Sequence, residues 1–350
     1  MITFAGFSDR NDKIIKRKNS EYIRVLILLN HKVNIQKIYQ IRQRFLQNIL
    51  SDMYSFESTL NNYRRNIYRL LKSELAEKTN RLKALVESLG GRVIHKIYSI
   101  GAISAFIPKS MLEVIRSNTL VRDIIRCAKF RVYMDVARKA VYANYLWNLG
   151  LDGSSNIGDI KPGIEVAVVD TGVDPNCKYL SGRIVDSKSF VSGEPPSDLH
   201  GHGTMVANII AGNHSTLTGI AYGANIINAK AMNAAGEGTM DDIIAAIEWA
   251  VTEASDTAEI INLSIGTSEL KPDGNSEITR FIDQIAFLYD VLPVIAVGNV
   301  EGGYSRVNVP ADAFNIISVG AMDDKNTYDR ADDVVYSGSC YGPTDDGRIK

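Results

Sequence analysis

Proline and glycine are almost missing from the N-terminal quarter of the sequence. The prolines begin at Pro108, and Gly6 is the single glycine before Gly90. Because these two residue types interrupt helices and form turns, their absence predicts a helix-rich region. Apolar residues at helical spacing between residues 35 and 89 indicate a helical stretch there, which Gly90 and Gly91 end.

Cysteine and long apolar runs are also scarce. The three cysteines, Cys127, Cys177 and Cys340, are widely scattered and form neither a CxxC nor a Cys/His metal spacing, which predicts free thiols. Residues 1–29 contain neither the apolar core of a signal peptide nor a membrane span. The sequence therefore predicts no membrane partner and leaves the compartment open.

Acidic residues are few in the N-terminal part, and basic residues are few in the remainder. Residues 1–138 hold 26 Lys and Arg against 11 Asp and Glu, whereas residues 139–350 hold 13 against 29. This split predicts two folded units of opposite charge that attract each other. A basic RNA-binding module is the alternative, but no recognisable nucleic-acid motif supports it, so we expect no nucleic-acid partner.

The N-terminal part has the predicted element order β-α-β-β-α-β. A strand at 22–29 and the helical stretch precede two strands, a short helix and a last strand, at 92–100, 102–107, 109–117 and 121–133. This order predicts a small α+β domain of the ferredoxin-like, split βαβ type. Unrelated proteins share that arrangement, so it indicates no function by itself.

From about residue 164, short apolar runs alternate with glycine-rich loops and helices. The runs lie at 166–169, 224–229, 260–263, 292–297 and 316–319, and the helix candidates at 204–211, 240–254 and 276–289. This alternation predicts an α/β domain with a doubly wound, mostly parallel sheet and helices on both faces. Function is then expected at the carboxyl ends of the strands.

An acidic residue, Asp170, follows the first of these apolar runs in the sequence VVDTGVD. At the end of a buried strand it either caps a turn or takes part in chemistry. The triplet DTG is also the signature of aspartic proteases, which need two such aspartates in an all-β fold. The sequence has no second DTG or DSG and its pattern is α/β, so this alternative is disfavoured.

A histidine, His202, stands 32 residues further on in the sequence DLHGHGTMVAN, in the first turn of a predicted helix. Gly201 and Gly203 beside it allow a close approach of backbone or substrate. A zinc site built from His200, His202 and His214 is the weaker alternative, because the helical HExxH spacing is missing.

The DTG strand and the GHGT helix together resemble the subtilisin family of serine proteases. Three further motifs extend the resemblance over about residues 140–350: AMNAAGEG at 231–238, INLSIG at 261–266 and VIAVGN at 294–299. The resemblance implies that Asp170 orients His202 and that His202 acts as general base and then general acid. It also implies that Asn299 donates its side-chain amide to the oxyanion.

The same resemblance implies which residues bind the substrate. Gly236 and Gly238 would form one edge of a cleft, and Ser264 and Gly266 the other edge. An extended polypeptide substrate would lie between them as an added strand. Gly298 would lie beside the oxyanion asparagine.

The nucleophilic serine of the family lies in a Gly-Thr-Ser-x-Ala type motif downstream of the oxyanion asparagine. The serines after Asn299 all lack that setting; they are Ser305, Ser318, Ser337 and Ser339. We therefore expect a serine endopeptidase whose nucleophile lies beyond the given residues, so that the 350-residue chain is itself inactive. Cys340 has no predicted activation as a substitute. A non-catalytic pseudoprotease or peptide-binding fragment that keeps the cleft is the alternative.

The N-terminal domain resembles the propeptide that this family uses as an intramolecular chaperone and inhibitor, although its helical stretch is longer. The expected organisation is a tail at 1–20, a propeptide-like domain at 21–138 and a C-terminally truncated catalytic domain at 139–350. Cleavage is expected between residues 133 and 140, with the propeptide docked on the catalytic domain. The resemblance implies no required cofactor, allows a structural calcium ion with unassigned ligands, and suggests secretion as the family habit.

Overall fold

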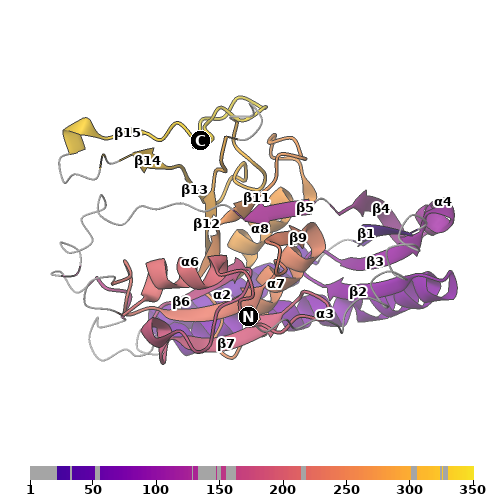
Figure 1. Ribbon diagram of the computed structural model, residues 1–350. Helices are drawn as coiled ribbons and strands as arrows, with labels where there is room; N and C mark the ends of the chain where they lie inside the picture. The colour runs from indigo at the N-terminus through magenta and orange to yellow at the C-terminus, as the bar shows by residue number, and fades with distance from the viewer. Residues whose placement is uncertain are drawn as a thin grey trace, which may run out of the picture. The chain divides into compact units, whose positions relative to one another are not determined.

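The computed structural model (Figure 1) describes residues 22–31, 34–51, 56–127, 129–132, 147, 151–154, 163–213, 218–300, 306–323, 325 and 330–350. The described residues fall into two compact units. The first unit takes in residues up to 33 and 70–127, and the second takes in residues 34–69 and 128–350. The long helix α3 (Phe56–Ser88) contributes to both units.

The first unit contains, among its described residues, a four-stranded antiparallel sheet in the order β2-β3-β1-β4. Its elements are β1 (Tyr22–Leu29), β2 (Arg92–Ile97), β3 (Ala102–Pro108), α4 (Leu112–Arg116) and β4 (Val121–Arg126). Helix α3 adds a buried stripe made of Leu71, Leu75, Leu82 and Val86. The predicted order of strands and helices is therefore present, and the assignment of this unit as a ferredoxin-like propeptide stays a prediction.

The predicted helical stretch consists of two helices, α2 (Ile35–Ser51) and α3. Gly90 has a φ of 79°, in the left-handed region that favours glycine, and the N–H of Gly91 donates to the carbonyl of Val86 at 2.9 Å. The predicted end of the helix at these two glycines is confirmed.

The second unit is built on a sheet that has six parallel strands within the described residues, in the order β13-β12-β10-β6-β8-β7. The strands are β6 (Glu165–Asp170), β7 (Ile184–Ser189), β8 (Asn225–Lys230), β10 (Ile260–Leu263), β12 (Leu292–Ala296) and β13 (Ile317–Val319). Five of them match the predicted apolar runs, which confirms the parallel α/β sheet. Strand β7 was missed because it is at the edge of the sheet and is only partly buried.

The sheet is accompanied by α6 (His202–Ala211), α7 (Met240–Thr252) and α8 (Glu277–Tyr289). Helix α6 packs through Val206 against Val166 and Val168 of β6. Alternate residues of β6, such as Val169, point to the opposite face, and α7, whose residues are all buried, contacts both β6 and β8. The sheet therefore forms the interior of the unit and presents its strand ends to the loops.

A smaller sheet in the second unit has the order β11-β5-β9. Its central strand, β5 (Lys129–Val132), is antiparallel to both β9 (Glu237–Thr239) and β11 (Ile265–Gly266). The predicted last strand at 121–133 is thus two strands in different sheets. Strand β4 stops pairing with β1 at Cys127, whose N–H donates to the carbonyl of Arg24. Strand β5 belongs to the smaller sheet with β9 and β11. A short pair, β14 (Met322–Asp323) and β15 (Val334–Val335), completes the strands of this unit that the structure describes.

All three cysteines are free thiols, as predicted. Among the described residues, no helix is both long enough and apolar enough to cross a membrane.

Candidate active site

The aspartate at the carboxyl end of β6 is completely buried. The backbone carbonyl of Asp170 accepts hydrogen bonds from the N–H groups of Ala231 and Met232, at 2.9 and 3.0 Å, which fixes the strand end against the neighbouring loop. Its side-chain Oδ1 accepts from the N–H of Thr171 at 2.7 Å. These contacts hold the carboxylate in one orientation at the edge where parallel strands place their functional residues.

His202 is the first residue of α6 and is 2% exposed. Its Nδ1 lies 2.7 Å from Oδ1 of Asp170. A carboxylate that accepts the Nδ1 proton leaves the lone pair of the neutral ring on Nε2. Within the described part of the chain, Oδ2 of Asp170 has no hydrogen-bond partner. Asp170 and His202, which the sequence assigned to the site, are thus in direct contact in the structure.

Glycine at position 203 makes this approach possible. A Cβ atom at Gly203 would lie 2.2 Å from the carbonyl oxygen of Gly172 and 3.2 Å from Oδ1 of Asp170. Any larger residue would therefore push the start of α6 away from the strand end. The helix begins after Gly201, whose φ of 101° also favours glycine.

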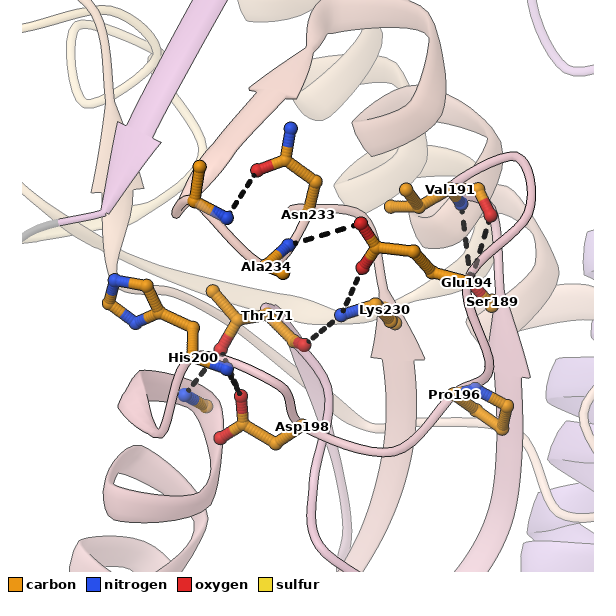
Figure 2. A network of polar contacts seen from close by, with 12 residues as sticks. Thr171, Ser189, Val191, Glu194, Pro196, Asp198, His200, Lys230, Asn233 and Ala234 are labelled. Carbon is orange, nitrogen blue, oxygen red and sulfur yellow. Dashed lines mark hydrogen bonds and ion pairs between the residues drawn. The ribbon is translucent and has the colours of Figure 1, made fainter. Parts of the chain in front are cut away.

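Asp198 holds the start of α6 in place. Its carboxylate accepts hydrogen bonds from the N–H groups of His200, Gly201 and Thr204 at 2.8 to 2.9 Å, and from the Thr204 hydroxyl at 2.7 Å. The Thr171 hydroxyl donates to it at 2.9 Å, so the same carboxylate also binds the residue after Asp170 (Figure 2). Burial raises the pKa of Asp198, but these hydrogen bonds outweigh burial and hold the pKa below its ordinary value.

A fully buried lysine lies beside this network. Lys230, the last residue of β8, donates to the backbone carbonyl of Thr171 and pairs with Oε2 of Glu194 at 3.2 Å. The other carboxylate oxygen of Glu194 accepts from the N–H of Ala234 at 3.2 Å. Figure 2 shows this series of contacts, which links the loop after Asp170 to the loop that leads into β9.

Asn299 follows β12 at the same edge of the sheet. Strand β12 is two strands, or roughly 10 Å, from β6 in the parallel sheet, and Asn299 lies three residues past the carboxyl end of β12. Its backbone forms an antiparallel bridge with Ser339, and the N–H of Val300 donates to the carbonyl of Gly338 at 2.7 Å. Gly298 has a φ of 100°, so the turn that presents the asparagine favours glycine.

The predicted edges of the cleft are the strands that flank β5. Gly238 in β9 is opposite Phe130, and Gly266 in β11 is opposite Arg131. Gly236 lies in the turn before β9 with a φ of 72°. Ser264 lies between β10 and β11, where its Oγ accepts from the Asn262 side chain at 3.0 Å. The chain's own segment β5 thus lies, as an extended strand, between the two edges that the sequence assigned to a substrate.

Sequence reasoning missed four polar residues of this site: Thr171, Glu194, Asp198 and Lys230. Two of them carry a signal in the sequence, because Lys230 directly follows an apolar run and Asp198 stands in a loop before glycine, where an aspartate side chain often accepts from the backbone two residues on. Glu194 carries none that we can identify. Two residues weighed earlier, His214 and Ser305, lie outside the described residues.

Comparison with known proteins gives consistent matches. A profile described as the subtilase family matches residues 161–350. Serine protease AprX of Bacillus subtilis (strain 168) is 31% identical over 254 residues, which cover 69% of this chain and 56% of that protein. A thermophilic serine proteinase of Bacillus sp. (strain AK1) is 35% identical over 193 residues, covering 54% of this chain and 43% of that protein. The chain thus spans about half the length of these relatives.

Proposed function

The chain belongs to the subtilase family, and from that premise we propose that it is the precursor of a subtilisin-like serine endopeptidase acting on polypeptides. The observation that carries the proposal is the buried contact of 2.7 Å between Nδ1 of His202 and Oδ1 of Asp170. An imidazole that a carboxylate holds in one tautomer is suited to accept a proton from a hydroxyl nucleophile.

In the proposed reaction, Nε2 of His202 accepts the proton of a serine hydroxyl while the serine oxygen attacks the carbonyl carbon of the substrate. The carbonyl electron pair moves onto its oxygen, which accepts a hydrogen bond from the Asn299 amide. His202 then donates the proton to the leaving amine as the C–N bond breaks. Water releases the acyl group by the same steps, and Asp170 stabilises the imidazolium each time it forms.

We place the nucleophilic serine outside the 350 residues. Cys340 is a poor substitute, because its side chain is buried and burial raises the pKa of its thiol above the ordinary value. The serines at 318 and 339 are used in structural hydrogen bonds: Ser318 donates to the Ala311 carbonyl, and Ser339 donates to the Cys340 carbonyl.

We further propose that an extended substrate takes the place of β5 between β9 and β11. The antiparallel pairing of β5 with both strands supports this, because backbone pairing is independent of the substrate's side chains. Residues 21–138 would then act as a propeptide that inhibits by occupying the cleft. Cleavage between residues 133 and 140, which lie outside the described residues, would separate the two parts.

The proposal can be tested with a serine-directed fluorophosphonate probe. A chain extended through the downstream serine segment is expected to react with the probe and to hydrolyse an extended peptide, and His202→Ala is expected to abolish both. His200→Ala is the matched control, because His200 is exposed and lies two residues away. An extended chain with intact His202 that neither reacts nor hydrolyses the peptide would overturn the proposal. Labelling of the 350-residue chain that His202→Ala removes would contradict the placement of the serine.

A further inference from the structure

Residues 34–69, which we call the helical anchor, belong to the same compact unit as the sheet of β6 to β13. The helical anchor consists of α2 and the first part of α3. It lies in the basic N-terminal part of the sequence, yet its side chains contact residues near 253–259 and 287–290. Residues 259 and 291 directly precede β10 and β12, so these contacts are at the amino ends of the strands.

Arg64 is a fully buried residue of the helical anchor. Its side chain is 0% exposed, and its Nε donates to the Tyr289 carbonyl at 2.8 Å. Nη1 donates to the carbonyl and hydroxyl of Thr257 at 3.1 and 3.0 Å, and it pairs with Oε1 of Glu259 at 3.2 Å. Nη2 donates to the Asp290 carbonyl at 3.3 Å. A guanidinium can remain charged in a buried position when its donors are satisfied in this way.

The guanidinium faces two acidic side chains at the start of the sheet. Oε2 of Glu259 accepts from the N–H of Glu165, the first residue of β6, at 2.8 Å. Glu165 is 1% exposed and accepts from the Asn225 side chain at 2.7 Å. Burial, with Glu259 close by, raises the pKa of Glu165 to about 9. Without Arg64, Glu259 would be left beside this second carboxyl with no cation in contact among the described residues.

Other residues of α3 bind the loop between α7 and β10. Asn61 donates to Oδ1 of Asp256 at 2.6 Å, Arg65 to the Ser255 carbonyl at 3.2 Å, and Tyr68 to Oε1 of Glu253 at 2.5 Å. Positions 61, 64, 65 and 68 are three and four residues apart, so they share one face of the helix. The helix therefore lies along the loop between α7 and β10 instead of touching it at a single point.

We propose that the helical anchor is a second attachment of the N-terminal region, held by Arg64, which keeps that region bound to the protease domain after the chain is cut between residues 133 and 140. The anchor binds the amino ends of the strands, whereas Asp170 lies at a carboxyl end, so it does not occupy the cleft. Its biological meaning rests on the proposed function, since it assumes that such a cut occurs.

The test uses the full chain with a recognition sequence for a site-specific protease inserted between residues 133 and 140. After cutting by the added protease, dissociation of the N-terminal piece is followed by gel filtration over time. The measurement is made in a Phe130→Pro background, because proline cannot donate to the pairing of β5, which would otherwise also hold the piece. The cut does not depend on the chain's own activity, so failure of the proposed function would leave this result interpretable.

We expect the piece to remain bound in the parent chain, and Arg64→Met to speed its dissociation at least about 30-fold, because truncation removes the buried guanidinium and leaves Glu259 and three backbone carbonyls without their donor. Arg69→Met, an exposed position on the same helix, is the matched control and should not change the rate. If Arg64→Met does not fold, the double variant Arg64→Met with Glu259→Gln removes both charges and should fold. The double variant should still release the piece faster than the parent. Immediate release from the parent chain, or equal rates in all folded variants, would overturn the proposal.

Discussion

Strand β6 has a buried acid at each end, Glu165 at its start and Asp170 at its finish, and the two have different neighbours. Glu165 faces a second carboxyl, Glu259, which is paired with a guanidinium. Asp170 faces an imidazole at 2.7 Å. One strand thus holds the same functional group in two settings, which allows the effect of the partner to be separated from the effect of burial.

The partner determines what each acid does. Beside another carboxyl in a buried site, Glu165 has a pKa raised to about 9 and keeps its proton at neutral pH, so it is suited to a structural role. Beside a histidine, Asp170 can orient an imidazole, the side chain that most often transfers protons in catalysis. Each end also has a fully buried cation, Arg64 at the start and Lys230 near the finish. The two proposals therefore assign attachment to one edge of the sheet and chemistry to the other.

The largest expected effect separates the two acids by activity. In a chain that contains the serine segment, Asp170→Asn should lower kcat/KM about 10⁴-fold, because the amide favours the wrong tautomer of His202. Glu165→Gln, at the other end of the same strand, should leave kcat/KM almost unchanged. Steady-state hydrolysis of an extended peptide measures both. Equal losses in the two variants would show that the ends of β6 do not differ in role.

A smaller effect, on the free energy of unfolding, should distinguish the two buried cations, Arg64 and Lys230. Arg64→Met should lower the free energy of unfolding by about 3–5 kcal/mol, because it leaves Glu259 unpaired. Lys230→Met should cost less, about 1–3 kcal/mol, since it removes two contacts, to the Thr171 carbonyl and to Glu194, whereas Arg64 makes five. Only Lys230→Met should also lower kcat, because Lys230 binds the Thr171 carbonyl next to Asp170. Urea denaturation and kinetics on the same preparations test this. A lowered kcat in Arg64→Met would contradict the expectation that only Lys230 affects catalysis.

The smallest effect is the pH dependence of stability, which should have opposite signs at the two edges. The pKa of Glu165 is raised from 4.5 to about 9, so its contribution is complete below pH 4.5 and is lost as pH rises through about 9. The pKa of Asp198 is lowered from 3.8, so its contribution is present above that pH and is lost on further acidification.

Thermal melts across the pH range test this pair. Glu165→Gln should flatten the alkaline limb by a few degrees, since about 1 kcal/mol corresponds to roughly 2–4 °C in a domain of this size. Asp198→Asn should flatten only the acid limb. A Glu165→Gln variant with the same alkaline limb as the parent would contradict the raised pKa.

Much of the carboxyl edge could be predicted because its signals are local. Asp170 ends an apolar run, and His202 begins a helix between two glycines, so both could be placed on elements before any coordinates were known. The place of β5 could not be predicted. A short strand pairs equally well with several edges, and its choice of β9 and β11 depends on backbone groups that every residue carries.

The sequence by itself determined the parallel sheet, because apolar runs and glycines report directly on local backbone geometry. The pairing of Asp170 with His202 and the place of Asn299 were implied by the resemblance to the subtilisin family. Only the tertiary structure decided that Arg64 is bound at the amino edge. Three of its acceptors are backbone carbonyls 193 to 226 residues further along the chain. A carbonyl is common to all residues and leaves no mark in the sequence, so folding alone brings such acceptors together around one side chain.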